Sequence, residues 1–239
     1  MIQSAPDQIL TDLAQHVGYK FEPVSALRID PPFWRKDMLR LFISHLSAYK
    51  TFAGELQEGL LPYGISGFVA HSDIEPTLEW MVQIETALAT CDALVALLHS
   101  EFHKSSWTDQ EIGFAMGRGI PVFSVKLGQD PYGFIGRFQA FSANGKNAKL
   151  IARELFDGYR KNKQTRQRMG DVLVRLFEQS GSFAEAKERV AYLEELEFWK
   201  PSYSTRISSA ADVNSQISGS WHVPGRVETL VKRWGNSGI

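Results

Sequence analysis

Between residues 39 and 125 the sequence alternates short apolar segments with longer amphipathic ones. We predict strands at 39–44, 67–70, 93–98 and 121–125, and helices at 48–61, 77–90 and 107–118 between them. Strands that are apolar on both faces and alternate with helices are typical of a parallel sheet covered by helices on both sides. The sequence therefore predicts an α/β domain.

The residues on either side of this region have different patterns. After Asn144 the pattern is helical, and we predict helices at 148–161, 164–179, 183–199 and 224–234. Small polar residues dominate 202–220, which we expect to be the least structured part of this region. The first residues hold one short amphipathic helix and a proline-marked connector. We divide the chain into an N-terminal extension (1–36), an α/β domain (37–163) and a C-terminal helical extension (164–239).

Charge and cysteine content narrow the class of protein. The 26 Lys and Arg residues nearly balance the 27 Asp and Glu residues, so no overall positive field is present to attract nucleic acid or an anionic membrane. The only cysteine, Cys91, cannot form an internal disulfide. We see neither a signal peptide nor an apolar run long enough to cross a membrane. We therefore expect a cytoplasmic protein.

In parallel α/β sheets, ligands bind beyond the carboxyl ends of the strands. Three polar segments follow the first three predicted strands, at 44–50, 71–77 and 99–107. The third continues into SSWTDQEIG at 105–113, where Glu111 comes four residues after Trp107 at the start of a predicted helix. In the alternative interpretation, Thr108 and Glu111 form a capping box that only satisfies the backbone N–H groups of the helix end.

Four segments, in order, resemble the TIR (Toll/interleukin-1 receptor-like) domain family. They are LFISH at 41–45, DIEPTLEW at 73–80, DALVALL at 92–98 and SWTDQE at 106–111, the last of which is similar to the Trp-x-x-x-Glu element of the family. The resemblance covers about residues 37–160 and implies a flavodoxin-like parallel sheet with helices on both faces. The chain differs from many relatives at Thr77 and Thr108, where they have glycine and cysteine.

The resemblance to enzymatic members implies cleavage of NAD. Glu111 would contact the hydroxyls of the nicotinamide ribose and stabilise charge as the glycosidic bond breaks. The chemistry agrees, because nicotinamide in NAD is already a cationic leaving group and needs no general acid, and one carboxylate can stabilise the oxocarbenium-like centre. The product would be ADP-ribose or a cyclic relative, and the resemblance also implies self-association through the TIR domain, bacterial antiphage defence and a downstream effector that senses the product.

Five further residues are candidates for substrate binding, each with a structural alternative. Trp107 would line the nicotinamide pocket or pack in the core. Ser44 and His45 follow the first strand and could contact the substrate, although a single histidine is often only a hydrogen-bonded polar residue. Asp73 would border the pocket or begin a turn. Lys50 would attract the pyrophosphate or lie in solvent.

No metal or separate cofactor is expected. His99 and His103 lie four residues apart in a loop without a carboxylate partner patterned for metal binding, and NAD would be a substrate. Two other interpretations of function remain at this point. A TIR domain can serve only as a scaffold for protein association, and a nucleoside deoxyribosyltransferase-like enzyme is similar in fold and also depends on a glutamate.

Overall fold

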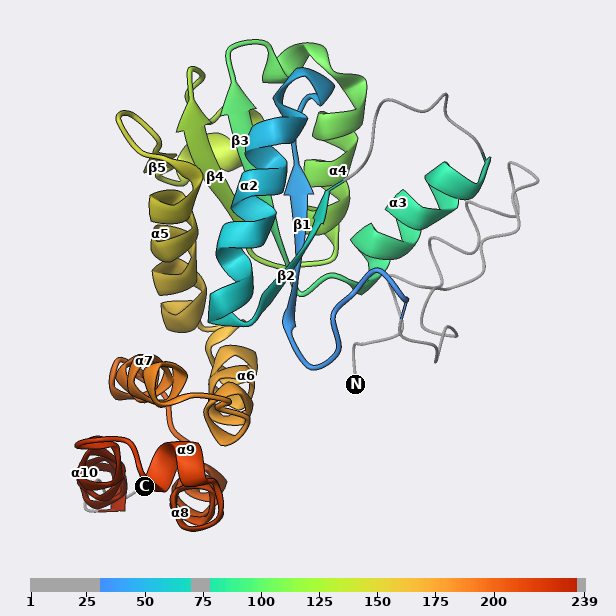
Figure 1. Ribbon diagram of the computed structural model, residues 1–239. Helices are drawn as coiled ribbons and strands as arrows, with labels where there is room; N and C mark the ends of the chain where they lie inside the picture. Colours follow the sequence, from blue (N-terminus) through green and yellow to red (C-terminus); the bar gives the residue numbers. More distant parts are fainter. Residues whose placement is uncertain (1–30, 70–77, 236–239) are drawn as a thin grey trace, which may run out of the picture.

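The computed structural model describes residues 31–69 and 78–235, and within them it has a five-stranded parallel sheet in the order β2-β1-β3-β4-β5 (Figure 1). The strands are β1 (Leu39–Ser44), β2 (Ile65–Val69), β3 (Ala93–His99), β4 (Val122–Leu127) and β5 (Phe141–Ser142). The predicted parallel α/β fold is confirmed. The sequence did not predict β5, because two residues of pairing with β4 leave no detectable hydrophobic pattern.

Helices cover both faces of this sheet. The main helices of the α/β domain are α2 (Lys50–Leu60), α3 (Leu78–Thr90), α4 (Ser106–Gly117) and α5 (Ala148–Lys161). Along β1 the side chains alternate between the two faces: Leu41 and Ile43 join a core cluster with α2 and α5, whereas Phe42 joins a second cluster with α3 and α4. Because successive side chains of a strand point to opposite faces of the sheet, this one apolar segment contributes to both hydrophobic cores.

Short 3-10 helices connect several of these elements. They are η2 (Ser47–Tyr49), η3 (Leu61–Tyr63), η4 (Phe102–Lys104) and η5 (Gly133–Arg137). Two of them, η2 and η4, lie in the segments that follow β1 and β3. They therefore shape the end of the sheet at which a ligand is expected.

The chain continues from α5 into a helical unit. Its helices are α6 (Arg166–Glu178), α7 (Phe183–Glu194), α8 (Pro201–Val213), α9 (Ser215–Ser218) and α10 (Val223–Gly235). The expectation of little structure at 202–220 was wrong, because α8 and α9 occupy this segment. Tyr203, Ile207 and Ala210 are buried at the spacing of one helix face, a signal that the many serines conceal. The helix predicted at 183–199 ends earlier, at Glu194.

The helical unit packs against the end of the sheet where the strands begin, and the arrows of β1, β3 and β4 in Figure 1 point away from it. One hydrophobic cluster runs from β1 and α5 into α6, α7, α8 and α10. Gly64 precedes β2 with a φ of 73°, and a Cβ atom there would collide with the side chain of Val172 on α6. The α/β domain and the helical unit therefore share one core.

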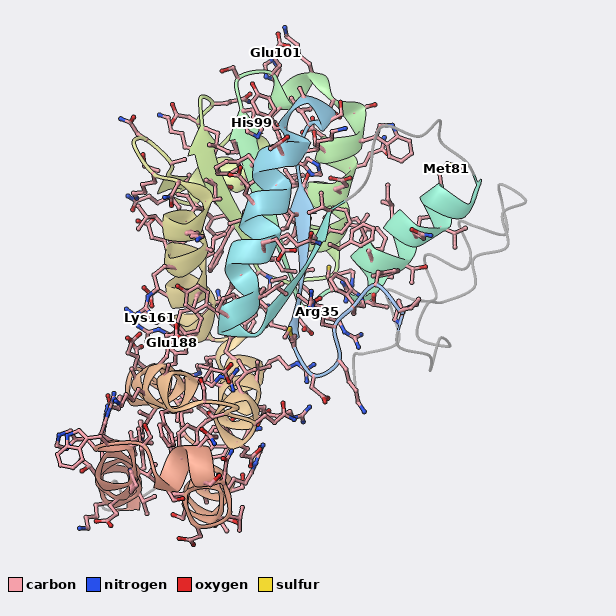
Figure 2. The ribbon with its side chains drawn as sticks, viewed as in Figure 1. Arg35, Met81, His99, Glu101, Lys161 and Glu188 are labelled. Carbon is pink, nitrogen blue, oxygen red and sulfur yellow. The ribbon has the colours of Figure 1, made fainter. Side chains whose placement is uncertain are left out.

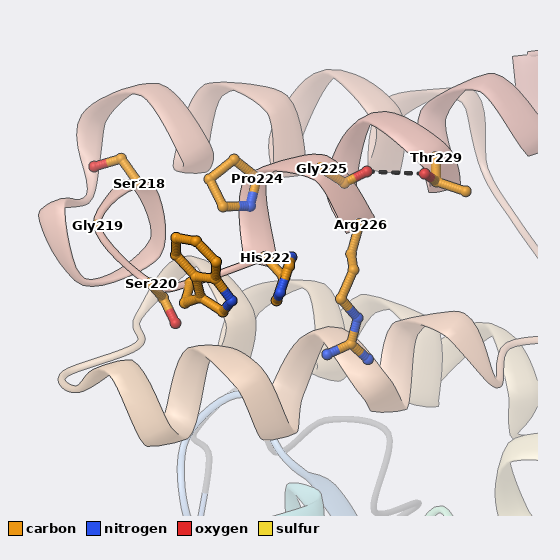
Figure 3. Close-up of a pocket in the computed structure, with 9 residues that line it drawn as sticks. Ser218, Gly219, Ser220, His222, Pro224, Gly225, Arg226 and Thr229 are labelled. Atoms are coloured by element: carbon orange, nitrogen blue, oxygen red, sulfur yellow. Dashed lines mark hydrogen bonds between the residues drawn. The ribbon is translucent and has the colours of Figure 1, made fainter.

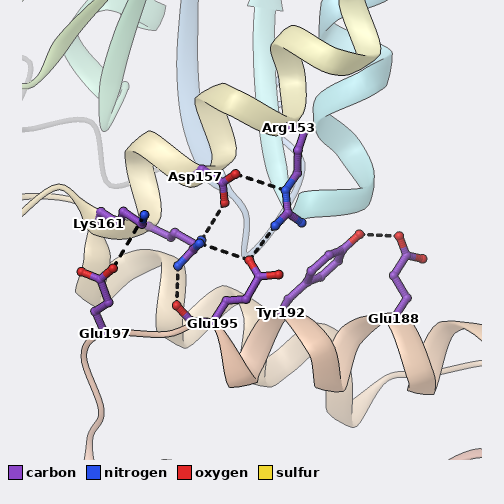
Figure 4. Close-up of polar contacts among 8 residues, drawn as sticks. Arg153, Asp157, Lys161, Glu188, Tyr192, Glu195 and Glu197 are labelled. Atoms are coloured by element: carbon purple, nitrogen blue, oxygen red, sulfur yellow. Dashed lines mark hydrogen bonds and ion pairs between the residues drawn. The ribbon is translucent and has the colours of Figure 1, made fainter.

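Polar contacts join the two parts at the end of α5 (Figure 4). Arg153 Nη2 donates to Glu195 Oε2 at 2.6 Å, and Arg160 pairs with Asp157 at 2.9 Å and with the same Glu195 carboxylate at 3.1 Å. The Arg160 guanidinium also donates to the Glu195 carbonyl oxygen. Because the Arg160 side chain is only 9% exposed, this network is better shielded from solvent than an ordinary surface ion pair.

Phe33 and Trp34, near the end of the predicted N-terminal extension, pack on the side of the sheet that α3 and α4 cover. Trp34 is 5% exposed, and its indole N–H donates to Thr90 Oγ1 at 2.8 Å. Phe33 contacts Phe68 of β2, with the ring centroids 4.9 Å apart. The short helix predicted near the start of the chain lies outside the described residues. Among the described helices, none combines the length and apolarity needed to cross a membrane.

Candidate functional site

The strand order places a topological switch point between β1 and β3. The chain passes from β1 outward to β2, and then returns to the other side of β1 to form β3. At such a point the segments that follow the two strands diverge, and their separation creates the crevice in which open α/β sheets bind ligands. Ser44 ends β1 and His99 ends β3, so these two residues mark the location.

Glu111 approaches this location from α4, the helix that follows β3. Ser105, rather than Thr108, caps this helix, and its Oγ accepts a hydrogen bond from the Thr108 N–H at 3.4 Å. Glu111 is the sixth residue of α4 and therefore lies in its second turn. The capping-box interpretation was wrong, because a capping carboxylate would have to lie three residues after the cap.

Thr108 anchors the beginning of α4. It is 2% exposed, and its hydroxyl lies 3.0 Å from the carbonyl oxygens of Phe102 and Ser105. Phe102 belongs to η4 and is fully buried. These contacts connect the turn after β3 to the first turn of α4, and so they fix the helix that carries Glu111.

The Glu111 carboxylate is buried and is hydrogen-bonded to Ser44. Glu111 is 7% exposed and Ser44 is 1% exposed. The Ser44 hydroxyl lies 2.5 Å from Glu111 Oε2 and donates to it. Burial raises the pKa of Glu111 to about 7, and the hydrogen bond from Ser44 acts in the opposite direction. A carboxyl group in this environment changes charge near neutral pH.

The other candidate residues differ in how far their side chains are exposed to solvent. The His45 ring contacts the Ile43 carbonyl oxygen through Nδ1 at 3.0 Å. Lys50 is exposed as the first residue of α2, and Trp107 is 46% exposed, so Trp107 is not a core residue. Asp73 lies outside the described residues. The structure thus brings Ser44 and Glu111 into contact and leaves Trp107 partly open to solvent on the same helix as Glu111.

Two aromatic rings at the switch point were not predicted as site residues. His99 is 2% exposed, and Tyr49 of η2 stacks on it with ring centroids 3.3 Å apart and planes 6° from parallel. Burial first, and the neighbouring His45 second, lower the pKa of His99 to about 4, so its ring is neutral at neutral pH. Figure 2 shows His99 and Glu101 at the same end of the sheet, opposite Lys161 and Glu188. The position of His99 at the end of the third strand is the sequence signal that could have identified it as a site residue.

Two hollows in the described part of the molecule lie away from the switch point. One of about 520 Å³ lies where α9 meets α10 in the helical unit, and Ser218, Trp221, His222 and Arg226 line part of it (Figure 3). Arg226 is engaged by Glu194 at 2.7 and 2.5 Å. Another hollow of about 480 Å³ lies beside β4 and β5. Neither lining includes an acidic side chain.

In the described ranges, 31–69 and 78–235, no three or more His, Cys, Asp or Glu side chains are grouped closely enough to hold a metal ion. The side chains described at the switch point are a buried carboxyl group with a hydroxyl donor, two histidine rings and a stacked tyrosine.

The fold and the site define a parallel α/β domain that carries a buried carboxylate at the switch point of its sheet. Residues 41–155 match the family model of the TIR domain, which confirms the resemblance predicted from the four sequence segments. Residues 41–155 therefore form a TIR domain, and the helical unit follows it in the chain. Among curated proteins, none matches the chain.

Proposed function

We propose that this protein cleaves the nicotinamide–ribose bond of NAD and that Glu111 stabilises the ribosyl centre as the bond breaks. The observation that carries the proposal is the buried Glu111 carboxylate beside the end of β1. TIR domain membership is compatible with this activity, which occurs in some members of the family. The proposal does not require a general acid, because the nicotinamide ring carries a positive charge before it leaves.

In the proposed reaction, the Glu111 carboxylate accepts hydrogen bonds from the ribose hydroxyls. The glycosidic bond breaks with its electron pair moving to nicotinamide, which leaves as a neutral molecule. Positive charge then develops at the ribose carbon and ring oxygen. Water attacks this carbon and loses a proton to give ADP-ribose, or a nitrogen of the adenine ring attacks and gives a cyclic product.

The burial of Glu111 would strengthen this stabilisation. A charge acts more strongly on a nearby charge where water is excluded, since the local dielectric constant is lower than in bulk solvent. The same burial makes the ionised carboxylate costly for the folded protein, so the charge is held at the expense of stability.

The test is release of nicotinamide from NAD by the full-length protein, followed by chromatography and by mass measurement of the second product. We expect Glu111→Gln to reduce the rate by about 100- to 1000-fold, as removal of one electrostatic stabiliser usually does. Glu55→Gln is a matched control, because it removes an exposed carboxylate from α2. Comparable turnover by folded Glu111→Gln protein would contradict the assignment.

The same chromatogram distinguishes the other two functions. Base exchange with deoxynucleosides and no reaction with NAD would support a deoxyribosyltransferase. Inactivity towards both substrates, across a wide range of protein concentrations, would support a role as a scaffold for protein association. Self-association, a downstream effector and a part in antiphage defence stay predictions of the same proposal.

A further inference from the structure

The contact between Ser44 and Glu111 joins two elements that are far apart in the sequence. Ser44 is the last residue of β1, and 67 positions separate it from Glu111 on α4. The backbone of Ser44 is fixed by the parallel ladder, in which it pairs with Ala96 of β3. Because Ser44 is 1% exposed and on a central strand, its hydroxyl is presented to the carboxylate by a rigid part of the fold.

The donor direction of this hydrogen bond determines what it does to the carboxyl group. An ionised carboxylate only accepts hydrogen bonds, so a hydroxyl that donates to it stabilises the charged form. Burial has the opposite effect and is the larger of the two. At 2.5 Å the contact has the length of a charge-assisted O–H···O⁻ bond. Ser44 therefore counteracts part of the pKa increase that burial causes.

The neighbouring titratable groups do not provide this effect. His45 follows Ser44, and its Nδ1 contacts the Ile43 carbonyl oxygen. His99 at the end of β3 is neutral, because burial lowers its pKa to about 4. On α4 itself, Asp109 accepts a hydrogen bond from Tyr132. Among the described residues, none of these groups contributes to the pKa of Glu111, whose causes are burial and Ser44.

We propose that Ser44 is a positioning residue of the site: its hydroxyl orients the Glu111 carboxylate and increases the fraction of it that is ionised at neutral pH, and it is not a substrate ligand. This inference rests on the proposed function, in which the ionised carboxylate is the active form. It also assigns Ser44 a different role from the substrate contact expected from the sequence. The two roles differ in how activity depends on pH.

Replacement of Ser44 by alanine separates these roles. Without the donor, the midpoint of the activity profile should move from about pH 7 to higher pH by about one unit. The rate at pH 7 would then fall about fivefold, and most of it would return at alkaline pH as Glu111 ionises. A serine that binds substrate would instead raise KM by a similar factor at every pH, with the midpoint unchanged.

Ser124→Ala is the matched control. Ser124 lies on β4 opposite Ala96, the same residue that pairs with Ser44 from the other side, and it is 3% exposed. Its hydroxyl has no hydrogen-bond partner among the residues that the structure describes. We expect Ser124→Ala to keep the midpoint of the parent protein. Ser44→Thr retains the hydroxyl and should also keep the midpoint, whereas Ser44→Cys supplies a weaker donor and should raise it.

The experiment measures kcat and kcat/KM for NAD across the pH range and, in parallel, titrates the Glu111 carboxyl group by NMR of isotope-labelled glutamate. The signal that disappears in Glu111→Gln identifies Glu111. An upward shift of both midpoints in Ser44→Ala or Ser44→Cys supports the proposal. An unchanged NMR midpoint in the folded variants, or an activity loss that is equal at every pH, would overturn it.

The NMR titration also separates this inference from the proposed function. If the parent protein releases no nicotinamide but its Glu111 midpoint still depends on Ser44, NAD cleavage fails and the coupling of the two side chains stands. If nicotinamide is released and the Glu111 midpoint is the same with and without the hydroxyl, cleavage stands and the role of Ser44 is wrong.

Discussion

Removal of the proposed catalytic carboxylate should make the protein more stable at neutral and alkaline pH. Glu111 is 7% exposed and receives a hydrogen bond from Ser44, with no cation among the causes of its pKa shift. Its ionised form is therefore more costly in the folded chain than in the unfolded chain. Glu111→Gln has a similar shape and carries no charge at any pH. We expect the variant to lack the destabilisation that ionised Glu111 causes in the folded parent protein.

The size of this effect follows from linkage between the pKa and folding. Burial raises the pKa of Glu111 from 4.5 to about 7. This difference of about 2.5 pH units, at about 1.36 kcal/mol per unit, corresponds to a loss of about 3 kcal/mol. The unfolded chain releases the proton first as pH rises, so stability is lost between about pH 4.5 and about pH 7 and the loss is complete above that range.

The assay is urea unfolding of the parent protein, Glu111→Gln and the control Glu55→Gln over a series of pH values. The quantity of interest is how the free energy of unfolding of Glu111→Gln, relative to the parent, changes with pH. The pH-independent effect of placing an amide in the site cancels in this comparison. We expect the relative stability of Glu111→Gln to rise by about 3 kcal/mol from acidic to alkaline pH.

A constant difference between Glu111→Gln and the parent at all pH values would refute the reasoning, because it would mean that Glu111 does not titrate differently in the folded chain. A relative stability that falls with rising pH would also refute it. That result would place a stabilising positive charge near the carboxylate. Glu55→Gln controls for the general effect of removing one negative charge.

Four further outcomes can be measured. NAD cleavage by the parent protein should increase with pH through a midpoint of about 7, which a pH–rate series checks, because the proposed reaction uses the ionised form of Glu111, whose pKa is about 7. Trp107→Ala should lower cleavage while costing less than about 1 kcal/mol in urea unfolding, since the ring is 46% exposed and leaves no buried cavity. Gly64→Ala should destabilise the chain by more than about 2 kcal/mol, because φ is 73° and the methyl group meets Val172, whereas Gly54→Ala within α2 has open space and should not. The rate of cleavage per molecule should rise with protein concentration in a dilution series followed by light scattering, and a constant rate from a monomer would contradict self-association.

The main parts of the fold could be predicted because their signals are local. Segments such as 93–98 are apolar on both faces, and β3 (Ala93–His99) requires that pattern in the centre of a parallel sheet. Helix α5 matched its predicted range of 148–161 because its apolar residues recur at helical spacing. The short strand β5 could not be predicted, since it depends on its pairing with β4 and not on its own sequence.

The candidate site could be predicted only in part, for a related reason. Ser44 was named from its position at the end of the first strand and Glu111 from its position near the start of α4, but their hydrogen bond depends on how α4 packs against β1. The sequence could not show that Ser105, rather than Thr108, is the N-cap of α4. Both residue types are favoured at N-caps, and a helix that begins after either one fits the sequence. The pairing of Tyr49 with His99 is likewise a tertiary contact.

The helical unit and Glu111 lie at opposite ends of the sheet, and this separation limits how the unit can influence the site. The unit contacts the chain where strands begin, through Val172 beneath Gly64 and through the network around Glu195. Glu111 lies at the end where strands finish. Within one chain, the helical unit therefore cannot contribute a side chain that contacts the Glu111 carboxylate.

Because the helical unit shares a hydrophobic core with the sheet, its removal would expose apolar surface rather than release an independent domain. An effect of the unit on cleavage must pass through that core or arise between molecules. Surface substitutions on its exposed residues Val213 and Trp221, which leave the shared core intact, can distinguish these two routes by their effect on the concentration dependence of the rate.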